Sequence, residues 1–245
     1  MIITLLTDFG IQDSYVAEMK GVLLSRLPEA QLVDISHHVS PGDVRAAQYL
    51  LSRTWSHFPR GTVHVAVVDP GVGTERRALA AESGGHRFLA PDNGLLSFLP
   101  EDARFVSLPV PAGASHTFHG RDVFAPAAAT LAAGESLEAL GTAVTRPVRV
   151  PLPTPRRDGT AIVGEVIYVD RFGTLISNIE PSAVSPGARI RVGDVEVGTL
   201  QRTFADAARG ALVAFVGSGG TIEIAVRDAS AARKLGVGAG AEVRA

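Results

Sequence analysis

The sequence predicts an α/β protein: an N-terminal α/β domain with a mostly parallel central sheet, followed by a smaller C-terminal β-barrel domain. In residues 1–150, apolar strand-like runs alternate with helical runs, a pattern typical of parallel sheets covered by helices. Residues 151–160 are rich in proline and are expected to form a linker. In residues 161–245, short β-like runs follow one another with only turn signals between them, which indicates a small barrel or sandwich.

The first predicted elements are a strand, a helix and a second strand. The first strand is expected over 2–6, and the helix begins at Asp13 or Ser14, either of which can cap it. Pro28 ends the helix, and the next strand is expected over 31–35. The apolar residues at helical spacing on one face of this helix are Val16, Met19, Leu23 and Leu27.

The second helix is predicted to begin within 40–43. Ser40 supplies a capping hydroxyl, Pro41 suits the first helical position, and Asp43 is an acid at the third. Its apolar face is expected to carry Val44, Ala47, Leu51, Trp55 and Phe58. The remaining predicted elements of this domain are strands over 63–68, 87–90 and 104–108 and an alanine-rich helix over 124–133.

The chain changes character at 146–160, where four prolines within nine residues exclude both a helix and a central strand. The strands predicted beyond it are 161–169, 174–179, 189–192, 195–200, 212–216, 221–226 and 242–244. Glycine-rich turns separate several of them, including 186–187, 193–194 and 217–220. Short strands joined by tight turns are typical of a small β-barrel.

Composition argues against several classes of protein. The chain has 245 residues and no cysteine, which excludes disulfides and zinc–thiolate sites and favours a cytoplasmic location. A formal net charge of -2 and an aromatic content of 6% argue against nucleic-acid binding. No apolar run approaches about 18 residues, so no membrane span is expected. The N-terminus carries no basic region before its first carboxylate, unlike a signal peptide.

The run 63–68 leads into the most informative stretch of the chain. Asp69 follows this predicted strand directly, at the edge where parallel sheets bind their ligands. Pro70 stops the strand, and a turn with two glycines leads to Arg76 and Arg77. The turn lacks the third glycine of a dinucleotide fingerprint and the Gly-Lys-Ser/Thr of a P-loop. A reaction site is therefore favoured over a phosphate cradle.

Two further polar residues of the N-terminal domain are candidates for the same cleft. Asp8 ends the first strand, and it is either a turn acid or an acceptor for a pair of hydroxyls, as in ribose recognition. His119 precedes a helix, where it is either incidental to a capping loop or part of the site. The turn 90–94 is either structural or lines the cleft. The remaining histidines show no metal-ligand spacing, so no metal is expected.

The C-terminal domain repeats the pattern of a carboxylate at the end of a strand. Asp170 is followed by Phe172, and Phe204 lies in a predicted loop. Loop phenylalanines usually fill cores, but two of them can also enclose a flat heteroaromatic ring. The segment 217–220 is either a tight hairpin or a group of backbone amides that, with the Ser218 hydroxyl, holds a carboxylate.

Six segments form a set that is far more specific than any single motif. They are Leu-Thr-Asp8-Phe-Gly, Val-Asp69-Pro-Gly-Val-Gly-Thr-Glu-Arg76-Arg, Ala-Pro-Asp-Asn93-Gly-Leu-Leu, Thr-Phe-His119-Gly-Arg-Asp, Asp170-Arg-Phe-Gly and Thr-Phe204-Ala-Asp. Together, and in this order over nearly the whole chain, they resemble the S-adenosyl-L-methionine hydroxide adenosyltransferases, relatives of the fluorinase and chlorinase.

The resemblance implies an N-terminal α/β domain, a C-terminal β-barrel and a homotrimer. It also implies active sites where the first domain of one subunit meets the second domain of its neighbour. The implied reaction is attack of water or hydroxide on the ribose C5′ of S-adenosylmethionine, which is the substrate. Methionine is released, adenosine remains, and no separate cofactor is expected.

In the matching motifs, Asp69, Arg76 and His119 correspond to the three residues that the hydroxide-using members place around the nucleophilic water. The halogenating relatives carry a tyrosine at the position of Asp69, and a tyrosine and a serine at those of His119 and Gly120. Loss of that serine removes a halide contact, so hydroxide is the predicted nucleophile. Arg76 is expected to face the nucleophile. Substitution of Arg77 is expected to do less harm than substitution of Arg76.

The resemblance further implies how the substrate is held. Asp8 corresponds to the acceptor of the ribose diol, and Phe172 and Phe204 to the pair that stacks on adenine. Asp170 and Ser218 correspond to the groups that hold the methionine amine and carboxylate.

The chain departs from the family pattern at two substrate-binding positions. Thr174 stands where an adenine-binding asparagine is expected, and Asn178 is the alternative residue for that contact. Gly219 follows Ser218 where the halogenases carry an arginine. Val226 is assigned to the same binding set.

Two rival functions use the same cleft. One is a non-catalytic module that binds a nucleoside or S-adenosylmethionine. The other is a different enzyme, either a halogenase that uses S-adenosylmethionine or a nucleoside phosphohydrolase.

Overall fold

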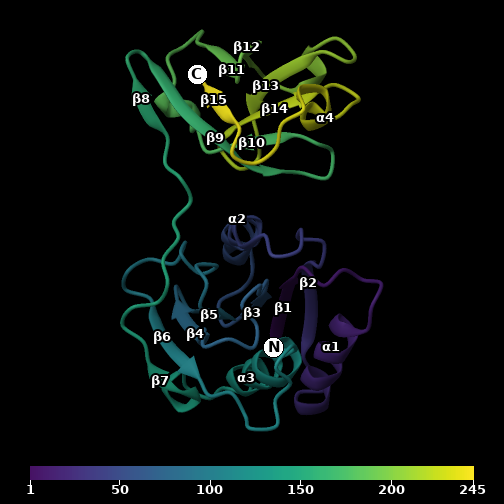
Figure 1. The fold of residues 1–245 in the computed structure, drawn as a ribbon, viewed down its shortest axis with the longest axis vertical. Helices are drawn as coiled ribbons and strands as arrows, with labels where there is room; N and C mark the ends of the chain where they lie inside the picture. Colours follow the sequence, from purple (N-terminus) through teal and green to yellow (C-terminus); the bar gives the residue numbers. More distant parts are fainter. The chain divides into compact units, whose positions relative to one another are not determined.

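The computed structural model describes residues 1–245, which divide into two compact units, Met1–Pro151 and Leu152–Ala245 (Figure 1). Each unit has its own sheet and its own hydrophobic core. No helix combines the length and the apolar character that crossing a membrane requires.

The first unit is built on one seven-stranded sheet. Its strands are β1 (Ile2–Thr7), β2 (Gln31–Ser36), β3 (Val63–Val67), β4 (Ala78–Ser83), β5 (His86–Pro91), β6 (Arg104–Leu108) and β7 (Thr142–Ala143). Their order is β2-β1-β3-β5-β4-β6-β7, and β2, β1, β3 and β5 are parallel. β4 is antiparallel to β5 and β6, and β7 is antiparallel to β6. The predicted mostly parallel central sheet is confirmed.

Helices cover both faces of this sheet. They are α1 (Tyr15–Arg26), α2 (Val44–Thr54) and α3 (Ala125–Ala132). α1 and α3 share a core with the central strands, in which Met19 of α1 and Phe124, just before α3, pack with Ile3 of β1. α2 lies on the opposite side of the sheet, as Figure 1 shows. Thr7 pairs with Val67, so the chain leaves β1 and β3 at the same edge of the sheet.

The second helix begins later than the sequence predicts, and Ser40 is not its cap. Asp43 is the N-cap residue, and its side chain accepts a hydrogen bond from the Ala46 amide at 2.9 Å. Gly42 adopts a φ of 74°, a left-handed conformation that a helix excludes. Regular helical geometry therefore starts only at Val44.

β4 is a strand that the sequence analysis does not predict. Its sequence, Ala-Leu-Ala-Ala-Glu-Ser, is rich in alanine, which is depleted in strands. It forms a hairpin with β5 through Gly84 and Gly85, which have φ values of 58° and 79°. The alternation of strands and helices is therefore interrupted after β3 by the β4–β5 hairpin, and β6 and β7 add further antiparallel strands beyond β4.

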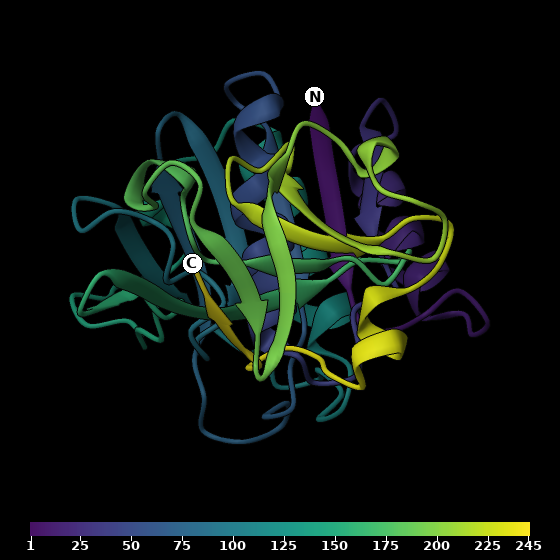
Figure 2. The ribbon, with the colours of Figure 1, turned by 90° about the horizontal axis from the view of Figure 1, so that it is seen from above.

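The second unit is a β-barrel (Figures 1 and 2). Its strands are β8 (Arg156–Asp158), β9 (Ala161–Val169), β10 (Leu175–Ser177), β11 (Arg189–Val192), β12 (Val195–Gln201), β13 (Leu212–Val216), β14 (Ile222–Val226) and β15 (Glu242–Arg244). Pairing of β10 with β9 closes the sheet, and β8 adds to β9 from outside. The predicted barrel is confirmed.

Two elements of the second unit are not predicted by the sequence analysis. β8 lies within 151–160, where a linker is expected; the prolines of that stretch end at 155, so Arg156–Asp158 are free to pair with β9. The short helix α4 (Ala231–Leu235) follows Ser230, whose side chain caps it. The barrel core includes Val166, Leu175, Ile190, Ile224 and Val243.

Candidate active site

The turn after β3 brings three polar side chains together. Arg76 donates from Nε to Asp69 Oδ1 at 3.0 Å and from Nη2 to Asp69 Oδ2. The same Nη2 lies 2.8 Å from Nδ1 of His119. The side chains of Asp69 and Arg76 are 5% and 9% exposed, and His119 is 5% exposed. The predicted trio is therefore a buried hydrogen-bonded cluster, with Arg76 in the middle.

The cluster fixes the state of the imidazole. Because a guanidinium can only donate, Nδ1 of His119 is the acceptor and its proton resides on Nε2. Burial lowers the pKa of His119, and the nearby positive charge of Arg76 lowers it further. His119 is therefore neutral at neutral pH and presents an Nε2–H donor. Nη1 of Arg76 is a second buried donor, and it has no hydrogen-bond partner.

A glycine allows the turn to pack against the loop that carries His119. Gly73 has a φ of 77°, and a Cβ atom at this position would lie 2.4 Å from the carbonyl oxygen of His116. Any side chain there would push the two loops apart. Gly73 thus permits the close approach that places Asp69 and Arg76 beside His119.

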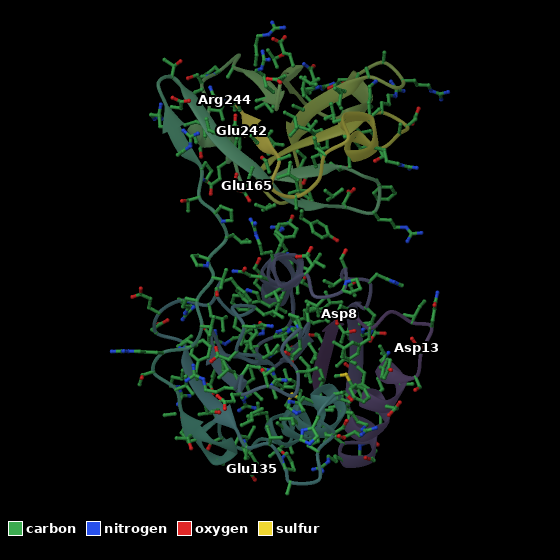
Figure 3. The ribbon with its side chains drawn as sticks, viewed as in Figure 1. Asp8, Asp13, Glu135, Glu165, Glu242 and Arg244 are labelled. Atoms are coloured by element: carbon green, nitrogen blue, oxygen red, sulfur yellow. The ribbon has the colours of Figure 1, made fainter.

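A cavity of about 310 Å³ opens beside the cluster. Its lining residues are Asp8, Phe9, Pro41, Gly42, Val67, Asp69, Pro70, Val72, Thr117, Phe118, His119 and Gly120. Asp8 follows β1, as Figure 3 shows, and its Oδ2 accepts a hydrogen bond from the Gly42 amide at 2.8 Å. The structure therefore brings Asp8, Asp69 and His119 to one cavity, with Arg76 behind Asp69.

The turn 90–94 supports the site from outside the cavity. Asn93 donates from Nδ2 to the carbonyl of Val68 at 2.9 Å, directly before Asp69. Arg77 points elsewhere: its Nε donates to the buried Asp92 at 2.7 Å, and its Nη2 donates to the carbonyl of Arg146 at 2.7 Å. Of the two interpretations of the turn 90–94, the contacts therefore favour a structural role over lining the cavity.

The second unit has a pocket of about 790 Å³ that contains most of the predicted binding residues. Those that line it are Asp170, Phe172, Thr174, Phe204, Ser218 and Val226. Phe172 and Phe204 are 78% and 56% exposed, so both rings are accessible at this pocket. Oδ1 of Asp170 accepts from the amides of Phe172 and Thr174 at 2.9 and 2.8 Å, which orders the turn between them.

Asn178 does not line this pocket, so the alternative adenine contact loses its basis. Its Oδ1 accepts from the Glu165 amide at 2.9 Å, and its Nδ2 donates to the Pro153 carbonyl at 2.7 Å. The charged residues of the pocket other than Asp170 are not marked by any motif spacing in the sequence. They are Arg171, Arg202, Glu223, Asp228 and Arg233.

No group of three or more His, Asp or Glu side chains is arranged to hold a metal ion.

Comparison with known proteins identifies the family. The family models described as the N-terminal and C-terminal domains of SAM hydroxide adenosyltransferase match residues 3–141 and 164–244. The chain therefore belongs to the SAM hydroxide adenosyltransferase family.

Curated relatives and a solved structure agree with this family. The (R)-S-adenosyl-L-methionine hydrolase of Thermus thermophilus is 43% identical, over 98% of this chain and 97% of the relative. The protein of the same name from Salinispora tropica is 38% identical, over 99% and 96%. The fluorinase of Nocardia brasiliensis is 32% identical, over 99% and 96%. The crystal structure of an uncharacterized conserved protein from Thermotoga maritima superposes with a TM-score of 0.91 at 35% identity, covering 100% of this chain and 99% of that one.

Proposed function

We propose that this chain hydrolyses S-adenosyl-L-methionine to adenosine and L-methionine, by attack of water or hydroxide on the ribose C5′. The observation that carries the proposal is the buried cluster of Asp69, Arg76 and His119 beside a cavity, in a chain 43% identical to a protein named (R)-S-adenosyl-L-methionine hydrolase. Family membership supports the same chemistry.

The charges of the reaction suit a buried site. The sulfonium of the substrate is cationic, and its leaving group is a neutral thioether. Attack by hydroxide therefore neutralises charge, which a site shielded from water favours. The C5′–O bond forms, the C5′–S bond breaks, and one proton of the attacking water is released. The water is the reactant that needs activation, because its pKa in bulk is about 15.7.

The cluster offers groups for that activation. Nη1 of Arg76 and Nε2–H of His119 are donors that can stabilise oxygen as it becomes hydroxide. Both oxygens of Asp69 accept hydrogen bonds from Arg76, which holds the carboxylate rigidly. We assign to Asp69 the role of orienting the water.

The remaining residues form the proposed substrate-binding set. Asp8 accepts the 2′ and 3′ hydroxyls of the ribose, and the exposed rings of Phe172 and Phe204 enclose the adenine. Asp170 and Ser218 hold the amine and carboxylate of the methionine portion. Thr174 and Val226 complete the adenine end of the pocket.

The names of the relatives suggest which sulfonium epimer is the substrate. Several are named for the (R) epimer, and we propose that this chain also hydrolyses it. Each epimer is incubated with the purified protein, and the products are separated by chromatography. Adenosine and methionine in equal amounts are expected from the (R) epimer. Binding without either product from either epimer would identify a binding module instead.

A halogenase is the second candidate, because a fluorinase is 32% identical to this chain. Gly120 stands where the halogenases carry the halide-binding serine, so adding chloride or fluoride is expected to produce no 5′-halo-adenosine. Appearance of a halogenated nucleoside would reverse the assignment of the nucleophile.

We also propose a homotrimer located in the cytoplasm, with each active site formed by the first unit of one subunit and the second unit of its neighbour. The family resemblance supports this arrangement. The division of the proposed binding residues between two pockets, one in each unit, is compatible with it.

A further inference from the structure

His37 lies outside the cavity but is bonded to the loop that carries Asp8. It follows β2, and Thr7, opposite it, is the last residue of β1. Nδ1 of His37 is 2.8 Å from Oγ1 of Thr7, and the His37 carbonyl accepts from the Gly10 amide at 2.7 Å. Oγ1 of Thr7 also accepts from the Phe9 amide at 3.2 Å. Hydrogen bonds of Thr7 and His37 therefore hold the backbone on both sides of Asp8.

The other side of the imidazole faces a charged pair on the surface. Oδ1 of Asp34 lies 3.1 Å from Nε2 of His37, although the contact does not meet hydrogen-bond geometry. Oδ2 of Asp34 is 2.6 Å from the Lys20 ammonium. Burial opposes the charged form of Asp34, but its bonded ion pair with Lys20 and the close contact with the His37 ring prevail and lower the pKa of this carboxyl. Asp34 is thus ionised at neutral pH.

The negative charge of Asp34 beside Nε2 of His37 determines which atom donates in the hydrogen bond between His37 and Thr7. It favours the imidazole tautomer with its proton on Nε2, which makes Nδ1 an acceptor. The hydroxyl of Thr7 then donates to Nδ1, and its oxygen is free to accept from the Phe9 amide. Thr7 is fully buried and His37 is 5% exposed, so water does not compete for these bonds.

Regular strand pairing does not hold the segment that follows β1. Residues 8–10 lie beyond the last pair of β1 with β3, Thr7 with Val67. Besides the bonds of Thr7 and His37, this segment is held by the bond from the Gly42 amide to Asp8 and by the Phe9 ring, which packs edge-on against Tyr15 and Phe118. Deleting the His37 acceptor leaves the Thr7 hydroxyl free to rotate and weakens the hold on the Phe9 amide.

We propose that His37 is a positioning residue that, through Thr7, holds Asp8 where it accepts the ribose diol. This role rests on the proposed function of Asp8, and it assigns to a buried histidine a part in nucleoside recognition although it does not touch the cavity.

The test compares adenosine with 2′,3′-dideoxyadenosine, which lacks the hydroxyls that Asp8 would bind. Calorimetry on the full-length protein measures the Kd of each nucleoside. The wild type is expected to prefer adenosine by on the order of 100-fold, since two bonds to a carboxylate are lost with the dideoxy compound. His37→Leu, which has no acceptor, is expected to lower this preference about tenfold by displacing the carboxylate.

Three variants separate positioning from general stability. His37→Asn places an amide oxygen near the position of Nδ1 and is expected to restore most of the preference. Thr7→Val removes the hydroxyl with little change of shape and is expected to reproduce the effect of His37→Leu, even if His37→Leu folds poorly. His38→Leu replaces a neighbouring exposed histidine and is expected to change nothing.

Equal weakening of both nucleosides in His37→Leu and Thr7→Val would overturn the proposal, because a purely structural role affects both alike. A wild type that binds the two nucleosides equally would overturn it as well, by removing the role of Asp8. Failure of the proposed hydrolysis is a separate result, since it appears as absent products while the binding preference persists.

Discussion

Arg76 and Arg77 are neighbours in the chain, yet their guanidinium groups serve different carboxylates. Arg76 binds Asp69 and His119 beside the cavity, whereas Arg77 binds the buried Asp92 and a backbone carbonyl. The sequence predicts that Arg77 is the less costly residue to remove. These contacts predict two different effects of substitution: loss of Arg77 is expected to lower stability, and loss of Arg76 is expected to lower activity.

This separation can be measured with two substitutions. Arg77→Gln is expected to lower the free energy of unfolding by about 1–3 kcal/mol, because it deprives the buried Asp92 of donors. Its kcat should stay near that of the wild type. Arg76→Gln is expected to lower kcat by about 100-fold or more, since it removes the guanidinium that we propose stabilises the developing hydroxide. Denaturant unfolding and steady-state kinetics on both variants check this, and an Arg77→Gln variant that is folded but inactive would contradict it.

Asp69 is expected to be required for turnover. Asp69→Asn keeps the shape but removes the charge that orients the water, so kcat should fall by about 10²- to 10⁴-fold. Glu75→Gln is the matched control, because it neutralises an exposed carboxylate of the same turn and should leave kcat unchanged. Near-native turnover of Asp69→Asn would remove Asp69 from the mechanism.

Site residues are predictable from sequence where strand direction decides their position. Asp8 and Asp69 follow neighbouring parallel strands, so they had to leave the sheet at one edge. Asn178 follows a strand whose pairing with β9 shifts register between Ile176 and Ser177, which changes the side-chain alternation. Such a register shift leaves no signal in residue spacing, and the Asn178 side chain bonds to the backbone of Glu165 instead of lining the pocket.

At the scale of elements, prediction succeeds where apolar patterning is strong. β9, β11, β13 and β15 begin and end where the sequence predicts, because alternating residues line the barrel core between turn residues. β4 is missed because alanine does not mark a strand, and its burial comes from its partners β5 and β6. Tertiary pairing, which the local sequence does not encode, decides such elements.

The central strands also carry a buried polar chain that makes the first unit sensitive to acid. His64 of β3 is fully buried, and its Nδ1 lies 2.8 Å from Oγ1 of Thr4 in β1. Its Nε2 lies 3.1 Å from Nδ1 of His86 in β5. Burial, aided by the neighbouring His86, lowers the pKa of His64 from 6.5 to about 3.

The sign of the effect on stability follows from proton binding. Between pH 6.5 and about 3, the unfolded chain binds a proton at His64 that the folded chain does not. The contribution of neutral His64 to the free energy of unfolding is therefore fully present above pH 6.5. It is lost as the pH falls, by up to about 1.4 kcal/mol per pH unit. The Asn side chain of His64→Asn does not titrate. The amount by which this variant is less stable than the wild type should therefore shrink by about 2 kcal/mol between pH 7 and 4.5.

Urea unfolding at several pH values measures this difference. His57→Gln, at an exposed position, is the control and should follow the wild type at every pH. A deficit of His64→Asn that stays constant with pH would show that His64 does not couple folding to proton uptake.

At the scale of the whole molecule, the proposed substrate contacts are divided between two units. The first unit carries Asp8, Asp69 and His119, and the second carries the exposed Phe172 and Phe204. A trimer of 25.6 kDa chains, about 77 kDa in total, is expected from size-exclusion chromatography with light scattering.

Complementation tests whether neighbouring subunits share each proposed site. Asp69→Asn inactivates the first unit, and the double substitution Phe172→Ala with Phe204→Ala inactivates the second. If a site combines units from two chains, random co-assembly of equal amounts restores about one quarter of the sites, because each half is intact with a probability of one half. If a site lies within one chain, every chain carries one defect and no site is restored. Activity of the co-expressed mixture near a quarter of the wild type is therefore expected. Either variant expressed alone is the control, and a mixture no more active than the average of the two would assign each site to a single chain.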